Sequence, residues 1–478
     1  MDLDENEINA SIEIKQLTEE LTQFLIIREE IISTATGESI IDSEMLLDGI
    51  VVSDKGNLNM ETNPNTGNRA IDFSVNDKTA YVQSEDGKYG FRIQFASAAD
   101  NVLERYDKLQ LDLWGATLVK ESNPTRFTIK NVTAENIVSR SAGTPALAPA
   151  KEKYMAELTD EDLFTFVTLK DIEISNSNGA WTNVNDGYGF GSGTTNGGAN
   201  PPFFDCYPLS IRDKDGSSMS MLINMKVLWR RTPSSGGYGD PAAKEVPRGS
   251  GKLSGILVHT SLPRYGNIGK YSIRPLDQND ITIAEQRANG FSEVVAEWEW
   301  DGVATGSNTS WPATNANASN TGTAELTTTM GGINISIGNN WVRKEYNTTQ
   351  KGVLANTGVS AASNLWWNTT VSRGEGWLVK FSTTGINKPI YITFSAGGGS
   401  GSAASAFLPV NWHIEYSTNG TDFTAVPNSG YIVRPLVWWN NNMPQTVAPG
   451  NIDYTFMLPD EIRNKPEVSL RLVATSAV

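Results

Sequence analysis

Cysteine is almost absent from this chain of 478 residues. The single Cys206 excludes an internal disulfide and any zinc or redox site that needs a pair of cysteines. Histidine is nearly as rare, with only His259 and His413. A histidine-based zinc site or a serine–histidine–aspartate triad would depend on one of these two residues. Because each lies within a strand pattern, we interpret both as structural histidines.

Long apolar runs are missing as well, and so are clusters of basic residues. No run of about 18 apolar residues occurs, so the sequence predicts no membrane-spanning helix. The formal net charge is −16, and residues 1–50 carry much of it, with thirteen acidic residues against Lys15 and Arg28. Phosphate contacts need clustered lysine and arginine, so this charge balance argues against nucleic acid as a partner.

The N-terminal segment is acidic and polar before any strand pattern begins. Leu17, Leu21 and Phe24 recur at helical spacing, so we expect residues 1–36 to form an acidic tether with one short helix. The acidic residues directly after Met1 are typical of a chain cut just behind an export signal. We therefore expect membrane contact only through a lipid anchor outside this sequence.

From residue 37 onward, the pattern is that of short strands joined by tight turns. Residues 80–83 and 91–95 alternate in polarity and flank Asp86-Gly87, a strong signal for a β-hairpin. Residues 109–115 alternate in the same way and predict a half-buried strand. A unit of about five such strands closes best as a small barrel of the OB type, because closure removes exposed edges.

A second hairpin signal follows in the middle of the chain. Residues 206–211 and 219–223 have strand patterns, and an Asp-Gly turn lies between them at residues 215–216. Further along, residues 252–258 resemble residues 46–52 in composition and order. These similarities indicate an internal repeat.

The ends of the two repeats match best. Residues 127–137 align with residues 271–281, and an aromatic residue, a hydroxyl, an isoleucine, a cation and a final isoleucine correspond. We therefore predict two OB-like β-barrels, the first at residues 37–145 and the second at residues 146–288.

The remaining residues, 289–478, predict a different β architecture. Short alternating strands follow one another without intervening helices, and the turns are rich in Asn and Gly, as at residues 417–421. This pattern is typical of a β-sandwich or jelly roll. The predicted fold class is thus mainly β, with a short N-terminal helix, two OB-like β-barrels and a C-terminal β-sandwich of the jelly-roll type.

One motif is similar to that of a known family. Residues 47–54 read Leu-Asp-Gly-Ile-Val-Val-Ser-Asp, a Gly-Asn turn follows at residues 56–57, and residues 271–274 with 280–281 close the pattern. This combination resembles an OB-fold-like domain family of unknown function from surface lipoproteins of Bacteroides-type bacteria. The resemblance covers about residues 8–284.

The family often ends its first hairpin strand with an aromatic residue followed by Gln-Asp, whereas residues 81–84 here read Tyr-Val-Gln-Ser.

The C-terminal part resembles jelly-roll modules of secreted and surface proteins through residues 376–383 and 412–423. The two resemblances imply an exported, lipid-anchored protein at the cell surface, on the outer membrane and outside the cytoplasm. They imply no catalytic residues. Related sandwiches often bind sugars, and this expectation is an analogy of fold.

Few residues suggest catalysis or metal binding. Glu297, Glu299 and Asp301 offer carboxylates of the kind that hydrolyse glycosides, but Glu297 and Glu299 share one face of a strand, which we interpret as solvated. Residues 213–216 could offer calcium oxygens, yet they lack the distal Glu and flanking helices of an EF-hand, so we predict a plain β-turn. We expect no cofactor and no metal site; calcium in the sandwich is an option without a located site.

Tryptophan is the most informative residue type, because ten of the thirteen lie in the C-terminal region. Neighbouring residues on a strand point to opposite faces, so one ring of each Trp-Trp pair must point away from the core. A ring beside several amides is a platform for the apolar face of a sugar, while packing under a loop is the alternative. The predicted ligand-binding residues are Trp366, Trp367, Trp438, Trp439, Asn440, Asn441 and Asn442.

These observations favour a non-enzymatic cell-surface protein that binds an extracellular glycan or glycoprotein through its C-terminal sandwich. Two alternatives remain open from the sequence. The chain could be a structural or accessory subunit of a surface complex, with the Trp pairs at an interface with a protein partner. It could also be a glycosidase whose carboxylate pair the sequence does not reveal.

Overall fold

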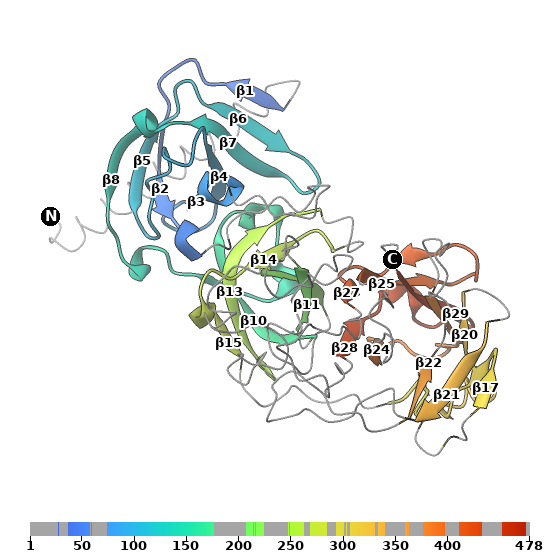
Figure 1. The fold of residues 1–478 in the computed structure, drawn as a ribbon. Coiled ribbons are helices and arrows are strands. Elements are labelled where there is room, and N and C mark those ends of the chain that lie inside the picture. The colour runs from blue at the N-terminus through green and yellow to red at the C-terminus, as the bar shows by residue number, and fades with distance from the viewer. Residues whose placement is uncertain are drawn as a thin grey trace, which may run out of the picture. The chain divides into compact units, whose positions relative to one another are not determined.

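The chain is mainly β, as the sequence predicts, with barrel and sandwich sheets (Figure 1). This computed structural model describes residues 27, 37–57, 59, 74–175, 207–213, 215, 217–223, 247, 249–261, 268–283, 293–300, 303, 306–329, 333–339, 359–362, 376–396, 411–432 and 452–474. Of the predicted N-terminal helix, only Ile27 is among them, and it is helical and buried in the first core. Within these ranges, no helix combines the length and the apolar character needed to cross a membrane.

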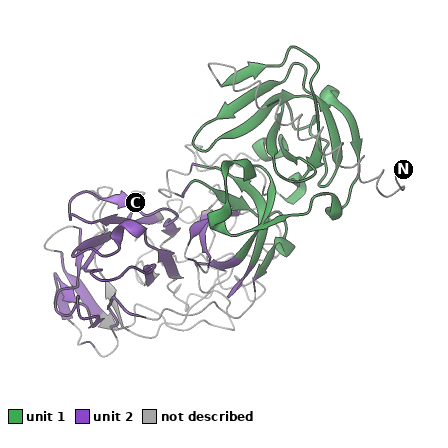
Figure 2. Ribbon diagram, turned by 180° about the vertical axis from the view of Figure 1, so that it is seen from behind, with its two compact units in different colours: residues 1–170, 252–260, 270–282 green, residues 171–251, 261–269, 283–478 purple. Residues whose placement is uncertain are grey.

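Two compact units make up the chain (Figure 2). Unit 1 contains residues 1–170, 252–260 and 270–282, and unit 2 contains residues 171–251, 261–269 and 283–478. The described helical elements are all short: η1 (Lys55–Asn57), α2 (Ser74–Asp77), η2 (Ala134–Asn136), η3 (Pro145–Leu147), η4 (Met155–Glu157), η5 (Asp160–Asp162), η8 (Gln278–Asp280) and η9 (Asp460–Ile462).

The first sheet lies entirely in unit 1. Its order is β1-β6-β7-β4-β3-β2-β5-β8. The strands are β1 (Glu38–Ile40), β2 (Leu46–Val51), β3 (Thr79–Gln83), β4 (Gly90–Phe95), β5 (Lys108–Asp112), β6 (Thr117–Glu121), β7 (Arg126–Val132) and β8 (Ile137–Ser141). Its β3–β4 hairpin is the one that the Asp86-Gly87 turn predicts.

This sheet closes on itself. Strands β2, β3 and β4 form an antiparallel meander, and β4 pairs in parallel with β7, where Arg92 lies opposite Thr128. Strand β5 pairs with β2 while β6 pairs with β7, and only residues 113–116 separate β5 from β6. Gly115 turns the chain there with a φ of 80°, which glycine adopts without strain. The β5–β6 segment therefore joins both ends of the array into an OB-like barrel.

The barrel encloses one apolar core. Six of the eight strands, β2 to β7, each contribute a residue with no exposed surface, because alternate side chains of a closed sheet point inward. These residues are Leu47, Val82, Ile93, Leu111, Leu118 and Ile129.

The second sheet repeats this arrangement. Its strands are β9 (Lys151–Lys153), β10 (Phe166–Ile174), β11 (Tyr207–Arg212), β12 (Ser218–Ile223), β13 (Ser250–Val258), β14 (Ser272–Arg274) and β15 (Ile281–Ile283). They follow the order β15-β13-β14-β12-β11-β10-β9, and β13 also pairs with β10. Strand β13 thus takes the place of the β5–β6 segment, and the predicted repeat of one small β unit is confirmed.

One detail of the predicted repeat is wrong. The sequence matches residues 252–258 with residues 46–52, but β13 occupies the position of β5, and β10 occupies the position of β2. Both segments are short apolar strands with a central glycine, so local composition alone cannot tell the first strand of a barrel from the fourth.

The match between the ends of the two repeats is confirmed. Strand β7, helix η2 and strand β8 follow one another as β14, η8 and β15 do. In the first repeat, the Thr133 backbone N–H donates to Asn136 Oδ1 at 2.8 Å. In the second, the Asp277 backbone N–H donates to Asp280 Oδ2 at 2.9 Å. The same loop therefore closes with an equivalent side-chain cap in both copies.

The C-terminal part of unit 2 is a β-sandwich. Its large sheet has the order β18-β20-β23-β29-β25-β26, with β27 also on β25, and β24 pairs with β28 in a facing sheet. Smaller sheets are formed by β16 with β19 and by β17, β21 and β22. The strands are β16 (Ala296–Glu297), β17 (Gly306–Asn308), β18 (Trp311–Pro312), β19 (Asn315–Ala316), β20 (Glu325–Thr328), β21 (Ile335–Asn339), β22 (Val359–Ala362), β23 (Gly376–Phe381), β24 (Tyr391–Ala396), β25 (Asn411–Ser417), β26 (Thr424–Ala425), β27 (Tyr431–Ile432), β28 (Ile452–Met457) and β29 (Val468–Ala474).

Aromatic rings fill the space between the two facing sheets. The Tyr431 ring is at the centre of the cluster, because its centroid lies 5.0–6.3 Å from four other rings. These four belong to Phe394, Trp412, Tyr454 and Phe456. Side chains from both sheets thus share one core, which defines the sandwich.

Gly376 at the start of β23 shows how closely the central strands approach. An ideal Cβ on this residue would lie 1.8 Å from the Leu472 carbonyl oxygen and 2.8 Å from its carbonyl carbon. We expect Gly376→Ala to lower the free energy of unfolding by about 1–3 kcal/mol or more, because backbone must move to make room. Urea unfolding would measure this loss. Gly306→Ala is the control, since its Cβ would meet nothing nearer than 3.9 Å, and an equal loss there would contradict the prediction.

Candidate functional site

Two adjacent strands of the large sandwich sheet carry charged side chains on one face. Glu415 on β25 lies opposite Arg471 on β29 in the antiparallel register. Their neighbours Ile414 and Leu472 belong to the sandwich core. Because successive side chains of a strand alternate between faces, Glu415 and Arg471 must lie on the face that points away from this core.

Glu415 contacts two other side chains on this face. His413 Nε2 lies 2.8 Å from Glu415 Oε1, and the Arg471 Nε–H donates to Glu415 Oε2. The Arg471 guanidinium also covers the Phe423 ring, with its central carbon 4.1 Å from the ring centroid. We call these four residues the outer-face cluster. Their arrangement combines an aromatic ring with a carboxylate, a guanidinium and an imidazole.

The cluster is mostly covered, and Arg471 is more exposed than His413 and Glu415. The side chains of His413 and Glu415 are 15% and 16% exposed, and that of Arg471 is 30% exposed. Burial acts to raise the pKa of the Glu415 carboxyl, but the hydrogen bonds from His413 and Arg471 outweigh it, so the pKa is lowered. Glu415 is therefore a carboxylate held in place by two donors.

His413 has one ring nitrogen without an assigned role. Its Nδ1 atom is buried and makes no hydrogen bond to any residue that the structure describes. Because Glu415 engages Nε2, the second nitrogen remains available to a further polar group.

Polar side chains continue the face on either side of the cluster. Ser417 on β25 lies opposite Ser469 on β29, which in turn lies opposite Lys380 on β23. This row of hydroxyl and ammonium groups runs parallel to the row that contains Glu415 and Arg471. Ser417 and Ser469 are 2% and 1% exposed, whereas Lys380 is exposed, so Lys380 is the member of this row that a ligand can contact.

The turn after β25 positions the aromatic member of the cluster. Asn419 Oδ1 accepts hydrogen bonds from the backbone N–H groups of Thr421 and Asp422, both at 2.9 Å. Gly420 has a φ of 76° within this turn, which a residue with a side chain would adopt with strain. The predicted Asn-Gly turn is thus confirmed, and the chain continues directly from it to Phe423.

The structure does not describe the residues of the predicted sugar platform. All seven of its residues lie outside the described part of the chain: Trp366, Trp367, Trp438, Trp439, Asn440, Asn441 and Asn442. The aromatic platform at these positions stays a prediction.

The other chemistry-bearing residues have ordinary surroundings where the structure describes them. Glu297 and Glu299 are exposed, and Glu297 Oε2 accepts a hydrogen bond from Asn315 Nδ2 at 3.0 Å. Asp213 Oδ1 accepts from the backbone N–H groups of Asp215 and Ser217, as in the β-turn that the sequence predicts. His259, just after β13, contacts the Lys270 carbonyl oxygen at 2.8 Å.

Sequence reasoning missed most of the outer-face cluster. His413 and Glu415 are two residues apart on a predicted strand and so share a face, a signal that points to their contact. No such signal exists for Arg471, because its register against Glu415 depends on pairing between strands 56 residues apart. Among the described residues, no three or more His, Cys, Asp or Glu side chains are grouped as they would be around a metal ion.

A comparison of the sequence with models of protein families finds no match. Comparisons with curated proteins and with solved structures find none either. The case for a function therefore depends on the side chains of the chain itself.

Proposed function

We propose that this protein is a non-enzymatic, lipid-anchored cell-surface protein that binds an extracellular glycan or glycoprotein through its C-terminal sandwich. The observation that carries the proposal is the outer-face cluster, in which Glu415 and Arg471 lie beside the Phe423 ring. It lies on the sheet face away from the core, where Arg471 keeps 30% of its side chain exposed.

The chemistry of the cluster suits a sugar. A sugar presents neighbouring hydroxyls. A carboxylate can accept hydrogen bonds from them, and a guanidinium can donate hydrogen bonds to them in one plane. It also presents an apolar C–H face, which packs on an aromatic ring such as Phe423. The exposed Lys380 on the neighbouring strand β23 gives a further donor for the hydroxyls of a second sugar residue. The Trp pairs and the Asn run after Trp439 remain part of this proposal as the aromatic platform.

Arg471→Met tests the site, because methionine keeps much of the apolar stem and removes the donors. We expect this change to weaken glycan binding about tenfold or more, since a hydrogen bond to a charged group contributes about 1.5–3 kcal/mol. Intrinsic Trp fluorescence of the full chain, titrated with a panel of soluble polysaccharides, would measure the affinity.

Arg463→Met is the matched control, because Arg463 lies on the same sandwich and pairs with Asp460 instead. If both variants bind as well as the parent, the outer-face cluster is not the site. A loss of glycan affinity in Trp367→Ala or Trp439→Ala would then place the site at the Trp pairs. Failure of the parent chain to respond to any glycan would contradict the proposed function and favour a protein partner.

A further inference from the structure

A buried amide in the first barrel has a donor that no described residue satisfies. Gln83 at the end of β3 has no exposed surface, and its Oε1 accepts a hydrogen bond from the Phe166 backbone N–H at 2.9 Å. An N–H can only face the oxygen of an amide, so this bond settles the orientation of the side chain. Nε2 must then point the other way, and it has no hydrogen-bond partner among the described residues. An unsatisfied buried donor is unfavourable and calls for an acceptor.

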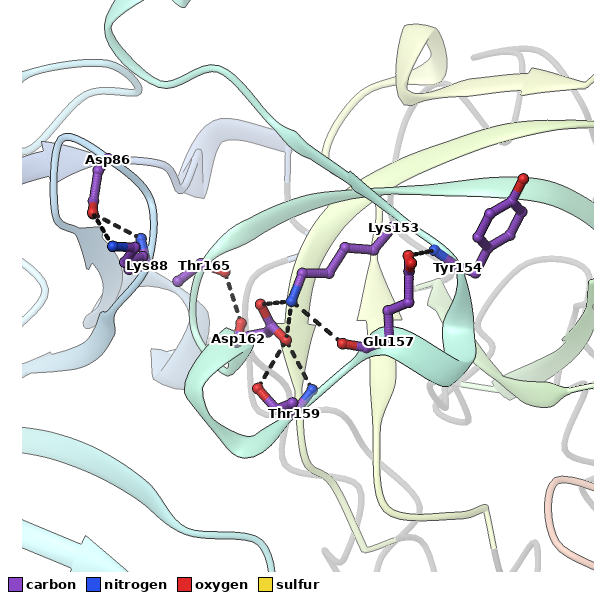
Figure 3. A network of polar contacts seen from close by, with 8 residues as sticks. All are labelled: Asp86, Lys88, Lys153, Tyr154, Glu157, Thr159, Asp162 and Thr165. Carbon is purple, nitrogen blue, oxygen red and sulfur yellow. Dashed lines mark hydrogen bonds and ion pairs between the residues drawn. The ribbon is translucent and has the colours of Figure 1, made fainter.

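Lys151 on β9 supplies a positive charge at the same place. Two other lysines nearby are paired: Lys153 Nζ lies 2.6 Å from Asp162 Oδ1, and Lys88 Nζ lies 3.6 Å from Asp86 Oδ2 (Figure 3). Lys151 makes no hydrogen bond or ion pair with any residue that the structure describes. Burial lowers the pKa of Lys151, with Asp162 acting against the shift. This group of three ammonium and two carboxylate groups therefore has one unmatched positive charge.

The two unsatisfied groups meet beside Gly87. An ideal Cβ on Gly87 would lie 3.2 Å from Gln83 Nε2 and 3.3 Å from Lys151 Cε. Gly87 has a φ of 66° in the β3–β4 turn, so glycine is the residue best suited to this position. The amide and the lysine stem therefore both border the space that a side chain at this position would occupy. Lys151 is half-buried, so its flexible end is within reach of solvent while the amide lies behind it.

We propose that Gln83 and Lys151 form a binding site for a carboxylate group. A carboxylate has two oxygens and one negative charge, which match one amide donor, one ammonium and the single unmatched charge of the group. On binding, the amide and the ammonium each donate to the anion. The ligand class is a carboxylate such as that of a uronic acid or of an acidic side chain. This site lies in unit 1, so it goes beyond the proposed function of the sandwich and stands without it.

The test uses the full chain labelled with ¹⁵N-glutamine and titrated with acetate and with glucuronate. We expect the side-chain NH₂ signals of Gln83 to shift and to saturate, with a Kd of about 1–10 mM for acetate. Lys151→Met and Gln83→Glu should each weaken acetate binding about tenfold or more, the second because its new carboxylate fills the site beside Lys151. A stronger response to glucuronate would show that the sugar ring adds contacts, and an equal response would show that the carboxylate alone is recognised; both support the site.

Lys88→Met is the matched control, because it removes one lysine charge from the β3–β4 turn next to Gly87, and Lys88 already pairs with Asp86. We expect it to change the acetate affinity by less than about threefold. An equal loss in Lys88→Met and Lys151→Met would overturn the proposal in favour of unspecific attraction. A Gln83 signal that does not shift would overturn it in favour of an ordered water on Nε2. Tighter binding of inorganic phosphate than of acetate would overturn the assignment to a carboxylate.

Discussion

Tyr431→Ala should destabilise the sandwich by about 3–5 kcal/mol, the largest loss that we expect from a single side chain in this protein. The ring is 1% exposed and contacts four other aromatic rings from both facing sheets. Truncation to the Cβ leaves a cavity between the sheets, and closing it would require both sheets to shift. Urea unfolding, followed by near-UV circular dichroism, would measure the loss directly.

Two controls separate this effect from the general loss of an aromatic residue. Tyr431→Phe keeps the ring and should retain most of the stability. Trp114→Ala removes a larger side chain that is 66% exposed on the first barrel, and we expect a change of about 0.5 kcal/mol or less. A loss below about 1 kcal/mol in Tyr431→Ala would show that the aromatic cluster does not organise the sandwich core.

Glu415→Gln should destabilise the sandwich in a way that depends on pH. At neutral pH, we expect a loss of about 1 kcal/mol, a modest value because solvent still reaches the pair with Arg471. The pKa of Glu415 is lowered in the folded protein from its ordinary value of 4.5. The unfolded chain therefore takes up a proton first as the pH falls. The stabilisation is complete above pH 4.5 and disappears as the pH falls through the folded-state pKa.

The measurement is the difference in free energy of unfolding between the parent and Glu415→Gln at about pH 7 and about pH 3. The difference should shrink towards zero at the lower pH. Glu461→Gln changes an exposed carboxylate of the same sandwich and should show almost no difference at either pH. A gap that stays constant between the two pH values would mean that the charge of Glu415 does not stabilise the fold.

Local pattern was sufficient for the parts of the fold that depend on near neighbours. The Asp86-Gly87 turn predicts the β3–β4 hairpin, because its flanking residues alternate and the turn residues allow only a tight reversal. The loop caps at Asn136 and Asp280 follow from the aligned ends of the repeat in the same way. Each of these features is decided within a few residues of chain.

The candidate sites depend on contacts that local pattern does not encode. Arg471 reaches Glu415 only because β29 lies beside β25 in one register, and a shift of β29 by one residue would turn Arg471 into the core. Gln83 is read from the sequence as the last residue of a strand and as a departure from a family motif. Its unsatisfied amide becomes visible only when the Phe166 backbone N–H is placed against Oε1.

The way in which each barrel closes also sets an order of folding. Gln110 on β5 donates to Asp48 on β2 across 62 residues of chain, and the hydroxyls of Thr168 on β10 and Ser254 on β13 meet across 86. During synthesis, the first barrel has all of its strands once β8 has left the ribosome, whereas the second must wait for β13 and β14. The N-terminal barrel therefore completes its fold first. We expect the second barrel to close more slowly, because its strands β10, β11 and β12 must wait for the distant strand β13 before the sheet can close.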